Sequence, residues 1–160
     1  MRSFEPRDLA QRWPSAAAFV VTGSIVIIAG GMTSAATAGA PSYLASWAVA
    51  YLVLVVGVAQ IALGFGQALL TSEPPSGRMV AGEWAVFNLG NAAVLAGSLL
   101  SMPALTSIGS ALLLGALAAL FWAVRGSTRA GWLRYAYWFL IAILFVSVFI
   151  GLLIARGRAA

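Results

Sequence analysis

The feature that most constrains this chain is a series of five long apolar runs separated by short loops. The runs cover residues 16–32, 43–70, 84–100, 108–124 and 132–154, and only the last contains a formal charge, Arg134 near its start. A helix that crosses the hydrocarbon core of a bilayer needs roughly 20 such residues. Because lipid offers no hydrogen bonds to the backbone, the α-helix is the natural spanning form. The sequence therefore predicts an all-α, polytopic membrane helix bundle with five transmembrane helices.

The expected domain organisation follows from these runs and from the breaks between them. The spans are predicted at about 16–37, 43–70, 80–100, 104–124 and 131–155, within a single transmembrane domain, 15–156. Residues 1–14 are expected either as a short interfacial helix or as an irregular tail, and 157–160 as a short C-terminal tail. The first apolar run resembles the core of a signal peptide but is longer than the usual 7–15 residues, so we expect a retained span.

Arginines are distributed unequally between the two sides of the predicted membrane. On the side of the N-terminus and the second and fourth loops lie Arg2, Arg7, Arg12, Arg78, Arg125, Arg129 and Arg134, whereas Arg156 and Arg158 lie opposite. Cytoplasmic loops of membrane proteins carry an excess of positive residues. We therefore expect a cytoplasmic N-terminus and an external C-terminus. Arginine is the only positively charged residue type in the chain, and alanine and glycine are abundant. These features favour a bacterial gene and a location in the plasma (inner) membrane.

The absence of several residue types restricts the chemistry of this chain. It contains no lysine, histidine or cysteine, so the ordinary ligands of haem, copper, zinc and iron–sulfur clusters are missing. Schiff-base and thiol chemistry are excluded for the same reason. The four acids, Glu5, Asp8, Glu73 and Glu83, do not form a catalytic pair. We therefore expect no enzymatic activity, no cofactor and no metal. The dispersed arginines favour contact with anionic membrane lipids over nucleic acid.

Polar residues enter the second and third spans in a helical pattern. In the second span, Gly57, Gln60, Gly64, Gln67 and Thr71 are separated by three or four residues and share one face. The third span offers a comparable face, with Asn88, Asn91 and Ser98, and with Gly90 and Gly97 nearby. Glycines allow helices to approach closely, and amides can hydrogen-bond across the contact. These residues predict either a packing seam between the two spans or a small polar cavity.

Two further features concern packing and charge. Ala111, Gly115 and Ala119 form a ridge of small residues on the fourth span, which is typical of a helix–helix contact. Glu83 begins the third span, where a carboxylate interacts favourably with the helix N-terminus. Arg78 precedes it by five residues and is expected at the same interface. A proton relay at Glu83 would need a second titrating group within the membrane, and the spans supply none.

The sequence leaves two functional hypotheses. The first is an accessory or assembly subunit of a larger membrane complex, because the chain lacks catalytic groups and large loops. Its partners would be other membrane protein subunits or further copies of itself. The alternative is a small oligomeric transporter, channel or lipid-binding protein that uses the polar residues of the second and third spans.

The predicted orientation can be tested with a reporter fused after Ala160. Five spans and a cytoplasmic N-terminus place this residue outside the cytoplasm. We expect alkaline phosphatase, which is active only outside the cytoplasm, to be active in this fusion and a fluorescent protein that folds only in the cytoplasm to be dark. The opposite pair of results would contradict the count of five spans or the orientation.

Overall fold

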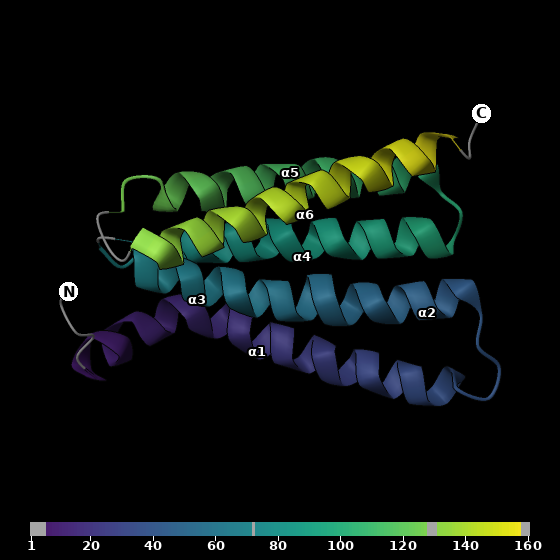
Figure 1. Ribbon diagram of the computed structural model, residues 1–160, viewed down its shortest axis with the longest axis horizontal. Helices are drawn as coiled ribbons and strands as arrows, with labels where there is room; N and C mark the ends of the chain where they lie inside the picture. The colour runs from purple at the N-terminus through teal and green to yellow at the C-terminus, as the bar shows by residue number, and fades with distance from the viewer. Residues whose placement is uncertain (1–5, 72, 128–130, 158–160) are drawn as a thin grey trace. The chain divides into compact units, whose positions relative to one another are not determined.

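The computed structural model describes residues 6–71, 73–127 and 131–157, and these residues form helices without any strand (Figure 1). The helices are α1 (Pro6–Thr37), α2 (Tyr43–Ala50), the π-helix η1 (Tyr51–Ala59), α3 (Gln60–Leu70), α4 (Gly77–Leu99), α5 (Pro103–Val124) and α6 (Gly131–Gly157). Because α2, η1 and α3 follow one another without a break, they form one span. Among the residues that the structure describes, five helices, with this span counted as one, are long and apolar enough to cross a membrane. This confirms the predicted fold class, and the protein is a multi-pass membrane protein.

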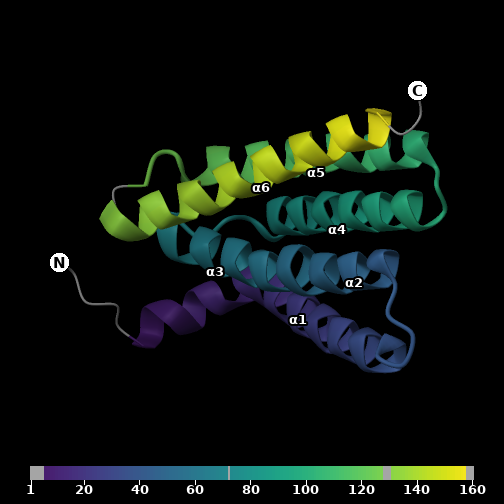
Figure 2. The same ribbon diagram turned by 45° about the vertical axis from the view of Figure 1, so that its right-hand side comes forward.

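The first helix joins the N-terminal segment to the first span. The boundary expected near residue 14 lies inside α1, at Pro14. Proline removes one backbone hydrogen bond and crowds the preceding turn, which bends a helix. Figures 1 and 2 show α1 changing direction in its N-terminal part. Residues 6–14 are therefore helical and continuous with the span, whereas residues 1–5 of the predicted lead-in lie outside the described residues.

Short polar or proline-containing segments determine where the next helices begin. The Ser42 hydroxyl accepts a hydrogen bond from the Ala45 amide at 3.1 Å, and the Ser76 hydroxyl accepts one from the Met79 amide at 3.3 Å. Both bonds satisfy an amide that has no partner within the first turn of its helix. Pro103 occupies the first turn of α5, where its missing N–H costs nothing. The predicted loops therefore correspond to real helix ends.

The chain divides into two compact units, residues 1–69 and 70–160. The first unit consists of α1 and the second span, up to the end of α3. The second unit contains α4, α5 and α6, and Figure 2 shows α6 beside α5. The predicted single domain of five spans stays a prediction.

Within the first unit, glycines bring α1 and the second span into close contact. A Cβ added at Gly23 would lie 2.8 Å from the Gly57 carbonyl oxygen, and one added at Gly57 would meet the Ile27 side chain. Gly64 leaves room for Phe19, which is fully buried. Only glycine permits backbones to approach this closely. The glycines predicted for packing in the second span therefore contact α1.

Within the second unit, glycines likewise bring α4 and α5 into close contact. A Cβ added at Gly109 would lie 2.6 Å from the Val94 amide nitrogen and 2.7 Å from the Gly90 carbonyl oxygen. A Cβ at Gly97 would lie 2.5 Å from the Thr106 hydroxyl oxygen. Gly90 and Gly97 were expected at a helix contact and do lie at one, whereas sequence analysis missed Gly109. The short connection between α4 and α5 turns through Ser101, whose φ of 54° lies in the left-handed region.

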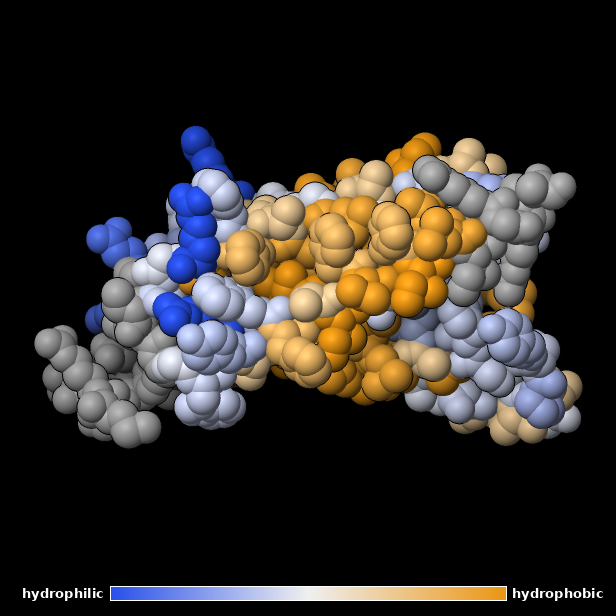
Figure 3. All heavy atoms as spheres, turned by 45° about the horizontal axis from the view of Figure 1, so that its top comes forward, coloured by the Kyte–Doolittle hydropathy of each residue, from blue (hydrophilic) through white to orange (hydrophobic). Residues whose placement is uncertain are grey.

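The outward faces of the helices are apolar. On the face drawn in Figure 3, hydrophobic residues gather over the middle of the helices and strongly hydrophilic residues toward one end. Along α6, large exposed side chains recur every three or four residues, at Trp132, Tyr135, Phe139, Ile143, Val146, Ile150 and Leu153. Tyr137, Ile141 and Leu144 on another face of α6 are buried. This division is typical of helices that contact lipid on one side and protein on the other.

We expect Gly109→Ala to destabilise the second unit. The new methyl group would meet the backbone of α4, and overpacking of this kind costs about 1–3 kcal/mol. The matched control is Gly115→Ala on the same helix, because nothing lies within 4 Å of a Cβ at Gly115. Thermal unfolding in one detergent should give a lower midpoint for Gly109→Ala only. Equal midpoints would show that the close contact between α4 and α5 is absent.

Candidate functional site

The second span contains a π-helix that ends at a buried glutamine. The segment Tyr51–Ala59 is wider than an α-helix, and its four valines and Gly57 disfavour regular α-helical packing. Gln60 follows directly and is 0% exposed, yet neither its Oε1 nor its Nε2 has a hydrogen-bond partner among the described residues. π-Helical turns often mark functional sites. The four closely spaced valines could have indicated this irregularity, but the sequence was expected to form a regular helix here.

The other polar residues predicted on the second and third spans lie in both units. Gln67 and Thr71 are buried near the end of the second span. On α4, the Asn88 amide donates to the Trp84 carbonyl at 2.8 Å, and the Asn91 amide donates to the Phe87 carbonyl at 2.9 Å. These bonds connect each asparagine to the preceding turn of its own helix. Asn91 is buried, whereas Asn88 and Ser98 are half-buried. A seam or cavity between the second and third spans stays a prediction.

The two charges predicted at the start of the third span lie in different environments. Arg78 is exposed in the first turn of α4, and Glu83 is only 6% exposed in the second turn. Glu83 interacts electrostatically with Tyr137 of α6, which is also buried. A buried carboxylate is stable only with compensating partners. Glu83 therefore lies in the protein interior, whereas the sequence predicts a charge at the membrane interface.

A cluster at the start of α6 was not found by sequence analysis. The Arg134 Nη1 donates to the Ser127 carbonyl at 2.7 Å, and its guanidinium lies 5.1 Å from the centre of the Trp138 ring. The Arg134 Nε, the Tyr137 hydroxyl and the Trp138 Nε1 are buried without a hydrogen-bond partner among the described residues. Tyr137 and Trp138 follow Arg134 by three and four residues, a spacing that places them beside it on one face of the helix. This spacing could have indicated the cluster from the sequence.

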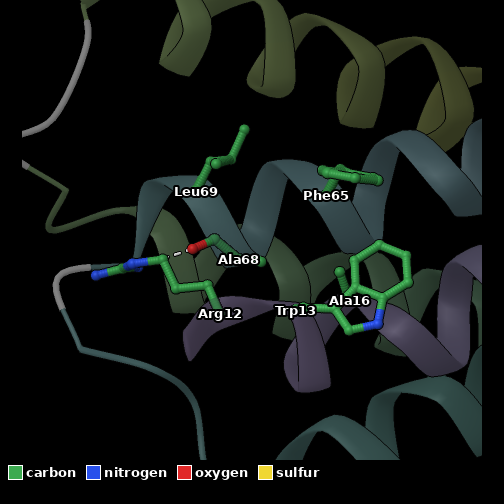
Figure 4. A pocket seen from close by; sticks show the side chains of 6 residues that line it. All are labelled: Arg12, Trp13, Ala16, Phe65, Ala68 and Leu69. Atoms are coloured by element: carbon green, nitrogen blue, oxygen red, sulfur yellow. Dashed lines mark hydrogen bonds between the residues drawn. The ribbon is translucent and has the colours of Figure 1, made fainter. Parts of the chain in front are cut away.

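A groove lies between α1 and α3 of the first unit. It has a volume of about 230 Å³ and is lined by Arg12, Trp13, Ala16, Phe65, Ala68 and Leu69. Arg12 is 7% exposed, and its Nη1 donates to the Ala68 carbonyl at 2.7 Å. Figure 4 shows the guanidinium at one end of the groove and the rings of Trp13 and Phe65 at the other. These rings lie 6.0 Å apart in an edge-to-face arrangement.

The small-residue ridge on α5 lies away from α4 and α6, the other helices of the second unit. Ala111, Gly115 and Ala119 are exposed, and nothing lies within 4 Å of a Cβ at Gly115. The ridge is therefore not used for packing within the second unit, in contrast to Gly90 and Gly97 of α4. Large exposed side chains, Ile108 and Trp122, lie before and after it on the same helix.

The chemistry of these arrangements is that of binding and packing. Among the described residues, no group of three or more His, Cys, Asp or Glu residues could hold a metal ion. The buried polar groups include amides, hydroxyls, the guanidinium groups of Arg12 and Arg134, a phenol, an indole and the Glu83 carboxylate, and such groups can form hydrogen bonds. No family model matches the sequence, and neither the curated proteins nor the solved structures contain a match.

We expect Gln60→Leu to stabilise the protein. A buried amide without hydrogen bonds costs about 1–3 kcal/mol, which leucine of similar size would remove. The control is Gln67→Leu, because Gln67 is equally buried but takes part in an interaction. Thermal unfolding in detergent should give a higher midpoint for Gln60→Leu and no gain for Gln67→Leu. A lower midpoint for Gln60→Leu would contradict this expectation.

Proposed function

We propose that this protein is a non-catalytic accessory or assembly subunit of a larger membrane protein complex. The observation that carries this proposal is the exposed ridge of Ala111, Gly115 and Ala119 on α5. Association of helices in lipid relies on close van der Waals packing, because lipid is as apolar as the side chains. An exposed small-residue ridge therefore suits a transmembrane helix of a neighbouring subunit. Such a subunit needs no catalytic groups, which agrees with the residue types of the chain.

The proposal includes a location. The distribution of arginines supports a cytoplasmic N-terminus and an external C-terminus in the plasma membrane of a bacterium. In this orientation α5 would run toward the cytoplasm and α6 away from it. The ridge on α5 and the apolar face of α6 would then both be available to neighbours within the bilayer.

A second candidate is a small oligomeric transporter, channel or lipid-binding protein. It is favoured by Gln60, whose amide lies buried in a membrane span without a hydrogen-bond partner among the described residues. Polar groups at such positions often belong to solute pathways. Under this proposal, the polar residues of the second and third spans would contact the transported or bound molecule. Uptake of a solute into liposomes that contain only this protein would support it.

We expect the ridge to determine which proteins co-purify with this chain. Gly115→Leu would fill the ridge and prevent a neighbouring helix from approaching, whereas Ile25→Leu changes another exposed apolar residue without filling a ridge. After extraction from native membranes in a mild detergent, the unaltered protein and Ile25→Leu should retain partners in fixed ratio. Gly115→Leu should lose them. Retention of the same partners by Gly115→Leu, or a monomeric unaltered protein, would contradict the proposal.

A further inference from the structure

The C-terminal end of α5 carries an arginine that is stacked on a tryptophan. The Cζ of Arg125 lies 3.1 Å from the centre of the Trp122 ring. At this distance the guanidinium plane must lie flat against the ring, because an edge-on guanidinium would place its N–H groups inside the ring. The stacking therefore covers one face of the guanidinium and leaves the N–H groups directed outward in its plane.

The guanidinium of Arg125 is accessible and keeps its hydrogen-bond donors available. Arg125 is exposed, and Trp122 is 62% exposed. Among the described residues, the Arg125 guanidinium contacts the Trp122 ring and donates no hydrogen bond to a carbonyl or carboxylate group. Arg12 and Arg134 differ in this respect, because each donates to a backbone carbonyl. The donors of Arg125 can therefore bind an acceptor from outside the chain.

An apolar surface continues from Arg125 along the same face of α5. Phe121 and Trp122 lie four and three residues before Arg125, and residues at this spacing share one face of a helix. Phe121 is 40% exposed, and its ring lies beside that of Trp138 on α6, with 5.6 Å between the ring centres. Ala118 lies one further turn before the two rings and is exposed. Its small side chain leaves space next to them.

The depth of this face in a membrane follows from the end of the span. The apolar span is Pro103–Val124, and Arg125 is the next residue. The guanidinium would therefore lie at the level of the lipid phosphates, and the two rings at the level of the first acyl carbons. In the sequence, Arg129 and Arg134 follow Arg125 with no acid between them. The local charge thus favours an anion at this depth.

The order of charge and apolar surface along this face indicates which anion it suits. The planar fork of an arginine matches two phosphate oxygens at once. A free phosphate ion would contact Arg125 and leave the aromatic rings unused. A phospholipid presents its phosphate and its hydrocarbon in the same order along the bilayer normal as Arg125 and the two rings, and therefore matches both.

We propose that Arg125 and Trp122 form a binding site for an anionic phospholipid, with the phosphate oxygens accepting hydrogen bonds from the N–H groups of Arg125. The first part of an acyl chain lies against the rings of Trp122 and Phe121. Trp122 is the positioning residue, because its ring holds the guanidinium in one orientation. The site lies nearer the end of α5 than Gly115 of the small-residue ridge, and it does not depend on a neighbouring subunit at that ridge.

The proposal is tested by titrating the purified, delipidated full chain with phosphatidylglycerol or phosphatidylcholine and following the first bound lipid by native mass spectrometry. The unaltered protein should bind phosphatidylglycerol more tightly. Arg125→Gln should weaken this binding about tenfold, in line with the loss of a charged hydrogen bond. The matched control is Arg78→Gln, because Arg78 is also exposed near a helix end but has no aromatic ring contact among the described residues. This variant should bind as the unaltered protein does.

A second pair of variants tests the positioning role of the tryptophan. Trp122→Leu keeps an apolar side chain but removes the ring on which Arg125 is stacked, so phosphatidylglycerol binding should weaken several-fold. The control is Trp132→Leu, because Trp132 is 72% exposed at the start of α6 and has no arginine on its ring among the described residues. Equal binding by these two variants would contradict the positioning role.

A third measurement locates the lipid and leaves Arg125 in place. Phosphatidylglycerol that carries bromine on its acyl chains should quench the fluorescence of Trp122, which is identified by difference from a Trp122→Phe variant. Equal affinity of the unaltered protein for both lipids would overturn the proposal. The same conclusion would follow from equal losses in Arg125→Gln and Arg78→Gln, or from phosphatidylglycerol binding that leaves Trp122 unquenched.

Discussion

The close approach of helix backbones at glycine joins α1 to the second span in the first unit and α4 to α5 in the second. In water, burial of apolar side chains would hold helices together, but lipid removes most of that driving force. The remaining attraction is short-range packing, which is strongest where no side chain separates the backbones. Gly23 and Gly57 provide this contact in the first unit, and Gly90 and Gly109 provide it in the second. Many large apolar residues consequently lie on the outward faces, although others such as Phe19, Phe87 and Leu113 are buried between the helices.

The same constraint explains how polar groups are accommodated. Asn88 and Asn91 donate to carbonyl groups of their own helix, and Arg12 and Arg134 donate to carbonyl groups near helix ends. The backbone thus supplies acceptors that lipid cannot provide. Gln60 differs from these residues, because neither its Oε1 nor its Nε2 has a hydrogen-bond partner among the described residues. This difference makes Gln60 the residue most informative about a bound solute.

The sequence by itself determined the helical class, the spans to within a few residues and the presence of small-residue contacts, because apolar run length and residue size act locally. Only the tertiary structure decided which helices those glycines join, since Gly57 and Gly64 contact α1 and Gly115 contacts no other helix of the second unit. It also decided that Glu83 is buried and that Arg12 reaches the end of α3. Pairing between distant segments depends on how whole helix surfaces fit together, and a one-dimensional pattern shows a face without showing its partner.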